Sequence, residues 1–384
     1  MRKLKRYKQE HLLMFYDELK KEEKLNLKKQ IKKINFRKMK KLYKNSFKDD
    51  LIDIDKITNL NVIKKNKKYM NSGIEFIKKG EYGVVIMAGG NGSRLGFKGP
   101  KGCLELNVDN KFISLFEIYI NQLKEIINKY NIVIPLYIMT SSINDDETVS
   151  FFKKKNYFNY PKDKIKFFKQ DNLPILDTKG NLLLKDKSNI LFGPNGNGDV
   201  FKALRKNHLI KDMIMNNIKY CLFINVDNVL NKLVDFDFIG TVIENNYKLA
   251  SKTIKLENKK EWVFCKYKNH PFMLPTGFLN NQLFNKKIDD EYIYRYKNIS
   301  YHLISIDLIK KFSKVKLPYH RAYKKSIYIN SLNQKNSFKF EKFIFDAFMS
   351  SRDMLLYETN DSDFYPIKRI EDIKGAIEKL KNET

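Results

Sequence analysis

Residues 82–101 read YGVVIMAGGNGSRLGFKGPK, and this stretch decides the fold. The apolar, β-branched run over 82–88 predicts a buried strand, and it leads directly into a loop with four glycines between residues 89 and 96. Glycine lets backbone N–H groups approach an anion without a Cβ in the way, and Arg94 and Lys101 add fixed positive charge. The stretch therefore predicts a polyphosphate cradle that follows the first strand of an α/β sheet.

Other glycine-rich loops fit this stretch less well. A P-loop needs the pattern GxxxxGK[ST], which is absent, and a dinucleotide-binding GxGxxG occurs only with one extra residue. A tight turn without a ligand is the remaining alternative. The basic pair Arg94 and Lys101, with Pro100 stiffening the second, disfavours it.

Strands and helices are expected to alternate after this loop. Apolar runs predict further strands, and helical periodicity predicts the segments between them. The expected strands are 132–140, 164–168, 220–226 and 354–358, and the expected helices are 113–130, 200–217 and 341–350. A hairpin is expected over 172–189, and an irregular, strand-rich region over 258–300. This alternation predicts an α/β domain with a mostly parallel sheet.

The start of the chain has a different character. Residues 1–80 are highly charged, carry leucines and aromatic residues at helical spacing, and contain no glycine or proline before Gly73. They predict a helical appendage. We therefore expect an N-terminal helical segment (1–80), a catalytic domain (81–335) and a short C-terminal module (336–384).

The composition excludes several classes of protein. With 384 residues, of which 42% are hydrophobic, the chain is long enough for a sizeable core. No apolar run approaches the roughly 18–20 residues that span a bilayer, and no apolar segment follows the basic N-terminus as in a signal peptide. Three scattered cysteines and five histidines show no metal-ligand spacing. We expect a cytoplasmic protein that does not bind a membrane.

The formal net charge of +30 admits two interpretations. One is a nucleic-acid-binding or membrane-surface protein. The other is a lysine-rich composition without a dedicated partner, and it is favoured because lysine is spread along the chain while arginine is scarce. We expect no nucleic-acid partner. A diffuse positive field would still attract anionic nucleotides.

Two further motifs could complete a nucleotide site. Residues 193–199 read GPNGNGD and precede an expected helix, so backbone donors could hold a base edge or sugar hydroxyls, although a surface turn would look similar. The strand over 220–226 ends in Asp227 and Asn228. A carboxylate at the carboxyl end of such a strand is placed to hold Mg²⁺, the alternative being an Asx turn.

Taken together, these blocks carry a family resemblance. AGGNGSRLG followed by PKG resembles the signature loop of the UDP-sugar pyrophosphorylases, and residues 17–36 are similar to the N-terminal segment of the UDP-N-acetylglucosamine pyrophosphorylases. IMTS, FFKQ, PNGNG, VDN and EKFIFD continue the resemblance in order. It implies an α/β fold of the nucleotidyltransferase type, with a Rossmann-like mixed sheet flanked by helices.

The resemblance also implies roles for single residues. Catalytic roles fall to Arg94 at the β- and γ-phosphates of UTP, Lys101 at the α-phosphate and the incoming phosphate, and Lys368 closing over the phosphates. Asp227 would hold Mg²⁺. Substrate binding falls to Met87, Ala88, Gly89 and Gly90 in the loop, Gln170, Gly196 and Asn197 at the uracil, and Asn298 at the sugar. The implied reaction converts UTP and N-acetylglucosamine 1-phosphate to UDP-N-acetylglucosamine and pyrophosphate, without a protein nucleophile.

Two departures keep alternatives open. The acetylglucosamine enzymes carry a VEYSE-like block whose glutamate binds sugar hydroxyls, whereas residues 272–277, around Pro275, contain no carboxylate. The stretches GFKGPK and GDVF, in turn, lean towards the UDP-glucose pyrophosphorylases. A UDP-glucose or broad UDP-sugar pyrophosphorylase therefore stays an alternative, as does a catalytically dead nucleotide-binding homologue.

Overall fold

The computed structural model describes residues 2–47, 52–256, 261–288, 290–326, 328–329 and 335–382. The chain forms two compact units, each assembled from three stretches of sequence. Unit 1 comprises Met1–Ile52, Asp171–Asp199 and Leu317–Phe343, and unit 2 comprises Asp53–Gln170, Val200–Lys316 and Ile344–Thr384. The consecutive boundaries expected from the sequence, 1–80, 81–335 and 336–384, stay a prediction and are not the boundaries of these units.

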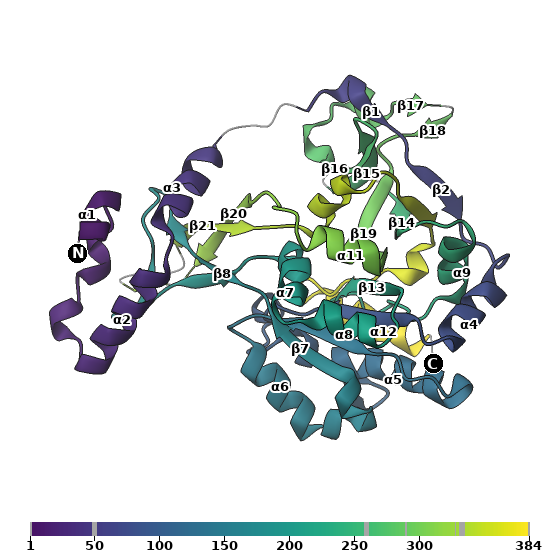
Figure 1. The fold of residues 1–384 in the computed structure, drawn as a ribbon, viewed down its shortest axis with the longest axis horizontal. Helices are drawn as coiled ribbons and strands as arrows, with labels where there is room; N and C mark the ends of the chain where they lie inside the picture. The colour runs from purple at the N-terminus through teal and green to yellow at the C-terminus, as the bar shows by residue number, and fades with distance from the viewer. Residues whose placement is uncertain are drawn as a thin grey trace. The chain divides into compact units, whose positions relative to one another are not determined.

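Unit 2 is built on a large mixed β-sheet with the strand order β2-β22-β14-β19-β13-β3-β6-β7 (Figure 1). In that order the strands are Asn61–Lys64, Leu355–Glu358, Leu249–Lys255, Tyr296–Ser305, Tyr220–Asn225, Tyr82–Met87, Leu136–Thr140 and Ile165–Lys169. Both pairs that involve β19 are antiparallel, and the other pairs along this order are parallel. The predicted α/β class with a mostly parallel sheet is therefore confirmed.

Smaller strand pairs extend this unit. β15 (Trp262–Tyr267) pairs with β19, with β1 (Ile57–Thr58) and with β16 (His270–Pro275). The remaining hairpins are β4 (Glu105–Val108) with β5 (Lys111–Ser114), and β17 (Lys287–Ile288) with β18 (Glu291–Tyr292). These pairs place the predicted strand-rich region after residue 260 beside the main sheet.

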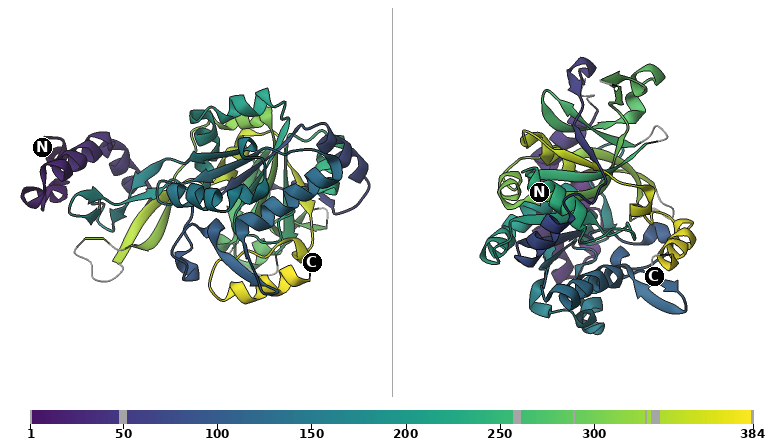
Figure 2. Two further views of the ribbon diagram at one scale, coloured as in Figure 1. Left: turned by 90° about the horizontal axis from the view of Figure 1, so that it is seen from below. Right: turned by 90° about the vertical axis from the view of Figure 1, so that its right-hand side faces the viewer.

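Helices cover both faces of the sheet, which explains why its central strands are continuously apolar (Figure 2). Leu222 and Ile224 of β13 belong to the core formed with α5, α6 and α9. Phe223, between them, points to the opposite face, where its ring lies 5.3 Å from that of Phe201 in α7. The helices are α4 (Met70–Lys78), α5 (Leu115–Tyr130), α6 (Asp145–Lys154), α7 (Val200–Lys206), α8 (Leu209–Met215), α9 (Phe236–Glu244), α10 (Asn281–Phe284), α11 (Ile306–Phe312) and α12 (Asp372–Lys381).

Three expectations about local structure are corrected. The helix expected over 200–217 is two helices, because His208 adopts a left-handed conformation with φ of 60° between them. The segment expected to be helical over 341–350 contains a 3-10 helix, Ile344–Ser350. The segment expected to be helical over 1–80 also contains strands, since the helix Phe36–Asn45 is followed along the chain by β1 and β2, which join the sheet of unit 2.

Unit 1 combines the N-terminal helices with short strands. Its helices are α1 (Arg2–Tyr7), α2 (Lys21–Lys33) and α3 (Phe36–Asn45). Its strands are β8 (Asn172–Pro174), β9 (Leu176–Asp177), β10 (Leu184–Asp186), β11 (Asn189–Ile190), β12 (Phe192–Pro194), β20 (His320–Ser326) and β21 (Lys335–Glu341). The hairpin expected around residues 178–181 is present: Leu176 pairs with Leu182, and Gly180 turns the chain with φ of 90°.

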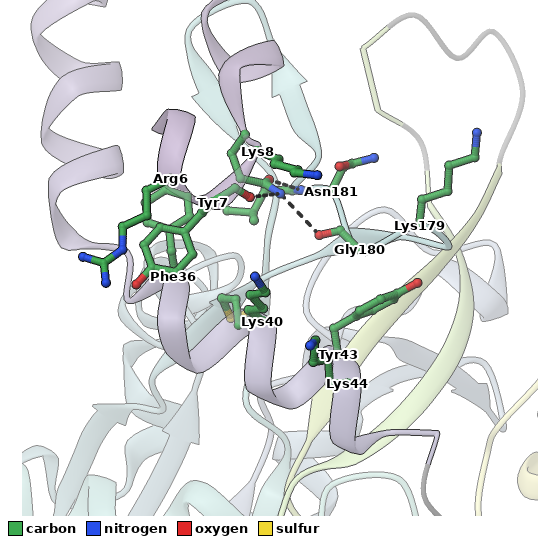
Figure 3. Close-up of a pocket in the computed structure, with 13 residues that line it drawn as sticks. Arg6, Tyr7, Lys8, Phe36, Lys40, Tyr43, Lys44, Lys179, Gly180 and Asn181 are labelled. Carbon is green, nitrogen blue, oxygen red and sulfur yellow. Dashed lines mark hydrogen bonds between the residues drawn. The ribbon is translucent and has the colours of Figure 1, made fainter. Parts of the chain in front are cut away.

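A pocket of about 270 Å³ opens in unit 1 between α1, α3 and the turn at residues 179–182 (Figure 3). Its cationic lining residues are Arg6, Lys8, Lys40, Lys44 and Lys179. None of the residues that line it is an aspartate or glutamate. In Figure 3, Lys40 points into the space between α3 and the turn, whereas Arg6 and Lys179 extend away from it.

Among the residues that the structure describes, no helix is long and apolar enough to cross a membrane.

Candidate active site

The glycine-rich loop is held open by hydrogen bonds to its own backbone. The side-chain amide of Asn144 donates to the carbonyl oxygens of Ala88 (2.9 Å) and Gly90 (3.2 Å), and the backbone N–H of Lys101 also donates to Gly90 (3.1 Å). A Cβ added to Gly90 would meet no heavy atom within 4 Å. The loop after β3 therefore presents open space directly beside Lys101, as a cradle for a ligand requires.

Gln170 lies against the next glycine of this loop. It follows β7 and is 6% exposed, and its Nε2 lies 1.9 Å from the position that a Cβ on Gly89 would take. The Oε1 atom of Gln170 is buried and has no hydrogen-bond partner among the described residues. A buried carboxamide with an unsatisfied atom is costly unless a ligand completes its hydrogen bonds. The structure thus brings Gln170 together with Gly89, and Met87 and Ala88 precede them at the end of β3.

Lys101 and Asp227 form the charged centre of the site. Their Nζ and Oδ2 atoms are 3.1 Å apart, and both side chains are partly buried, with exposed fractions of 15% and 24%. β3 and β13 are parallel neighbours, so the turns after their carboxyl ends meet at one edge of the sheet. The structure therefore brings together Lys101, which is predicted to bind phosphate, and Asp227, which is predicted to hold the metal.

The segment that carries Lys368 is joined to this centre through its backbone. The N–H of Ile367 donates to the carbonyl oxygen of Asp227 (2.8 Å), and Asn228 forms an antiparallel bridge with Pro366. Lys368 is the next residue, and its side chain is exposed. A lysine more than a hundred residues away in the sequence therefore lies one residue from a direct contact to Asp227.

Arg94 lies within the glycine-rich loop, between Gly92 and Gly96. It lies in a short 3-10 helix, Ser93–Leu95, which ends at Gly96 in the left-handed conformation with φ of 68°. Its side chain is exposed, and no ion pair to a described residue holds it. An exposed guanidinium on the rim of the loop is free to fork over phosphate oxygens.

The second loop, residues 193–199, belongs to unit 1 and is braced from beneath. Gly196 has φ of 88°, and a Cβ there would lie 2.5 Å from the carbonyl oxygen of Lys342. Lys342 Nζ pairs with Asp199 Oδ1 at 2.9 Å, and both residues are buried. Burial alone would lower the pKa of the Lys342 ammonium group, but Asp199 raises it. Asn197 lies in the short helix that follows Gly196.

The predicted sugar-contacting residue lies at an irregularity of β19. Asn298 pairs with Thr253, where the register to β14 shifts, and its Oδ1 accepts a hydrogen bond from the N–H of Ser300 (2.8 Å). The neighbouring Lys297 pairs with Glu261 Oε1 at 3.0 Å, and the carbonyl oxygen of Glu261 accepts hydrogen bonds from the backbone N–H and the hydroxyl of Thr276, both at 2.9 Å. Glu261 thus supplies a carboxylate beside the stretch 272–277, which has none of its own.

The donor set limits which metal could bind. No group of three or more His, Cys, Asp or Glu side chains is placed to hold a metal within the described ranges. Mg²⁺ does not need such a cage, because it keeps several waters and binds through one or two carboxylates together with substrate phosphates. The single, partly exposed carboxylate of Asp227 fits that mode.

Several supporting residues escaped the sequence analysis. Asn144 fixes the glycine-rich loop, Lys342 braces the second loop, and Lys252 lies buried under the C-terminal segment that carries Lys368. The only available signal was a polar residue within an apolar run, as for Lys252 in the sequence LASKTI. In a chain with 74 lysines and arginines that signal is weak.

Comparison with known proteins agrees with this geometry. A family model described as UTP–glucose-1-phosphate uridylyltransferase matches residues 15–378. A "Probable UDP-N-acetylglucosamine pyrophosphorylase" of Dictyostelium discoideum is 33% identical, with 94% of this chain and 81% of that protein aligned. The UDP-N-acetylglucosamine pyrophosphorylase of Saccharomyces cerevisiae is 36% identical over 74% of this chain and 63% of its own length. The crystal structure of the corresponding Trypanosoma brucei enzyme, in complex with an inhibitor, superposes with a TM-score of 0.80 at 25% identity and covers 99% of this chain and 83% of that one.

Proposed function

Because the chain belongs to the UTP–glucose-1-phosphate uridylyltransferase family, we propose that it transfers the uridylyl group of UTP to N-acetylglucosamine 1-phosphate and releases pyrophosphate. The observation that carries this proposal is the 3.1 Å pair of Lys101 and Asp227 beside the open space at Gly90. The names of the relatives support the acetylated sugar. A cytoplasmic location and the absence of a nucleic-acid partner remain predictions from the sequence.

The proposed reaction is an in-line displacement at phosphorus. An oxygen of the sugar phosphate forms a bond to the α-phosphorus of UTP, and the bond from that phosphorus to the bridging oxygen breaks, so that its electron pair leaves with pyrophosphate. No proton transfer to the protein is needed. Catalysis then depends on positioning and on stabilising charge in a partly buried site.

Each cation has a separate task in this proposal. Lys101 neutralises charge at the α-phosphate and the incoming phosphate, because its ammonium group pairs with Asp227, the predicted metal ligand. Lys368 approaches from the segment paired with Asp227, and Arg94 holds the departing β- and γ-phosphates from the rim. Mg²⁺, bound through Asp227, would lower the repulsion between the two anionic substrates.

Nucleotide recognition is assigned to uncharged groups. The unpartnered Oε1 of Gln170 is suited to a donor such as a uracil N–H, once the carboxamide orientation is set by that bond. Gly196 and Asn197 would contribute to uracil binding and Asn298 to sugar binding, as the family resemblance implies. Glu261 is a further carboxylate that could receive sugar hydroxyls near Asn298.

The proposal is tested by a pyrophosphate-release assay with UTP and Mg²⁺. N-acetylglucosamine 1-phosphate, glucose 1-phosphate and N-acetylgalactosamine 1-phosphate are compared at equal concentrations. Preference for the first supports the proposal. Preference for glucose 1-phosphate assigns the chain to the alternative UDP-glucose activity, which the description of the matching family favours. No turnover with any of the three would overturn the proposal and leave a nucleotide-binding homologue.

A further inference from the structure

A buried lysine that has no role in the proposed mechanism lies in the main sheet of unit 2. Lys252 projects from β14, and its side chain is 1% exposed. Its Nζ lies 2.5 Å from Asp235 Oδ2 and 3.3 Å from Asp363 Oδ2, and it lies over the ring of Tyr301 at 4.5 Å from the centroid. A buried ammonium group between two buried carboxylates is rare, because charged groups lose hydration on burial.

Each buried carboxylate of this cluster has a cationic partner. Lys65 Nζ also approaches Asp363 Oδ2 at 3.3 Å, and the hydroxyl of Thr359 donates to the same oxygen at 2.5 Å. Burial alone would raise the pKa of the Asp363 carboxyl, but the Lys252 ammonium group and the Thr359 hydroxyl lower it to about 2. Burial would likewise lower the pKa of Lys252, and the two aspartates raise it instead. With the pKa of the Asp235 carboxyl also lowered by Lys252, the three buried groups Lys252, Asp235 and Asp363 are charged at neutral pH.

Such a cluster is a poor way to gain stability alone. Buried ion pairs often stabilise a protein no more than apolar side chains of similar volume, although removing one partner is strongly destabilising. Their best-attested advantage is that they permit only one arrangement of the groups they join. The question is then which arrangement Lys252 fixes.

The cluster connects directly to the candidate active site. The carbonyl oxygen of Asp363 accepts a hydrogen bond from the side-chain amide of Asn228 (3.0 Å), and Asn228 Oδ1 accepts one from the N–H of Tyr365 (2.7 Å). Asp227 accepts the N–H of Ile367 two residues later, at 2.8 Å. Asp363 is thus the fixed end of a short segment that runs along the turn at Asp227 and finishes at Lys368.

We infer that Lys252 is a positioning residue for uridylyl transfer, which acts through Asp363 to hold the segment 363–368 against Asp227 and so sets the place of the Lys368 ammonium group. This inference rests on the proposed function. Asp235 completes the device from the other side, because it caps the N-terminus of α9 through the N–H of Phe238 (3.0 Å) and thereby anchors Lys252 to a rigid element.

The test is a double-mutant cycle in the full chain. The wild type, Lys252→Met, Lys368→Ala and the double variant are compared for kcat, for KM of UTP, and for hydrogen exchange of the peptide that contains Ile367. We expect Lys252→Met to lower kcat roughly 10- to 100-fold, since small misplacements of a reacting group have such effects. In the Lys368→Ala background the same change should lower kcat by no more than roughly 2-fold, because the two residues act as one unit.

Two further variants separate positioning from a general loss of stability. Thr359→Val removes one hydrogen bond from Asp363 and keeps every charge, so it should fold and show a smaller loss of kcat in the same direction. Tyr137→Phe removes the buried hydrogen bond to Asp212 (2.7 Å) elsewhere in unit 2 and should destabilise the protein without lowering kcat.

The outcomes distinguish the inference from the function on which it rests. If the wild type has no uridylyltransferase activity, the proposed function fails, and exchange at Ile367 still reports whether Lys252 holds the segment. The inference is overturned if Lys252→Met and Thr359→Val leave exchange and kcat unchanged. It is equally overturned if the losses of kcat in Lys252→Met and Lys368→Ala simply multiply in the double variant.

Discussion

Gly90 and Gly196, one in each of the two loops predicted to bind the nucleotide, lack a side chain for opposite reasons. In the loop after β3, a Cβ at Gly90 would meet nothing within 4 Å, so the missing side chain leaves room for a ligand. In the loop of unit 1, a Cβ at Gly196 or Gly198 would lie 2.5 or 2.6 Å from backbone atoms of Lys342 and Phe343. There the missing side chain leaves room for the protein's own chain.

The charges of the two loops differ in the same sense. Lys101 and Asp227 pair at 3.1 Å where solvent still reaches them, so each can exchange its partner for a phosphate or a cation. Lys342 and Asp199 are buried at 2.9 Å, and Asp199 also accepts the N–H of Asp171 (2.8 Å). The first pair is suited to binding substrate or metal, and the second is suited to stabilising the loop. A glycine-rich sequence therefore identifies a tight chain path, while its purpose depends on what surrounds it.

The largest expected effect tests the bracing role. Asp199→Ala leaves the buried ammonium group of Lys342 without its partner, and we expect the free energy of unfolding to fall by about 3–5 kcal/mol. Urea unfolding measures this loss. The control is Glu18→Gln, which breaks the exposed pair with Lys187 in the same unit and should barely move the midpoint. Similar small shifts of the urea midpoint in both variants would contradict a stabilising role for the buried pair of Lys342 and Asp199.

The next effect concerns the partly buried pair of Lys101 and Asp227. Lys101→Ala should lower turnover by about 10²–10³, as expected for the loss of one preorganised charge, while stability changes little. Lys98→Ala, an exposed lysine in the same loop, is the matched control and should retain turnover. Steady-state kinetics of pyrophosphate release measure the turnover of each variant, and a thermal melt measures its stability. An active Lys101→Ala enzyme would contradict the assignment.

A pair of alanine substitutions compares the two kinds of glycine directly. Gly196→Ala combines an unfavourable φ with a backbone clash and should destabilise the protein by about 1–3 kcal/mol. Gly90→Ala should leave the unfolding midpoint unchanged and weaken UTP binding, because the methyl group enters the ligand space. Chemical unfolding and UTP titration are measured for both variants. The reverse pattern would show that the loops have exchanged roles.

A buried histidine in unit 2 should make the stability of the protein depend on pH. Burial lowers the pKa of His302 to about 3 from 6.5, and the ring lies against Phe264 and Phe348 with Nδ1 bonded to Ser251 Oγ. Between pH 6.5 and pH 3 the unfolded chain binds a proton at this histidine that the folded chain does not. The free energy of unfolding therefore falls by about 1.4 kcal/mol for each pH unit of acidification. His302→Phe should flatten urea-derived stability between pH 7 and pH 5. An unchanged slope would contradict this explanation.

The sequence predicted the parts of the site that are local. The run 82–88 followed by glycines identified β3 and its loop, and Asp227 could be placed at a strand end because apolar residues precede it. Both depend on periodicity and turn chemistry within a few residues. The placement of Lys368 depended on resemblance alone, since nothing local announces a pairing between residues 366 and 228.

Elements stabilised by distant partners were less predictable. The strand β2 lies in a polar, lysine-rich stretch that looked helical, and its partner is β22, nearly three hundred residues later. Lys252 was not singled out from the sequence, because the two carboxylates that make its burial possible come from other segments. Such residues follow from tertiary contacts, which single-sequence periodicity does not report.

The pocket in unit 1 has a consequence for how the protein responds to its solvent. Its lysines repel one another, and no carboxylate lines the cavity to offset them. Dissolved salt screens such repulsion, with a Debye length of about 10 Å at 0.1 M. Moderate ionic strength should therefore stabilise this part of the chain, while it weakens the exposed ion pairs elsewhere.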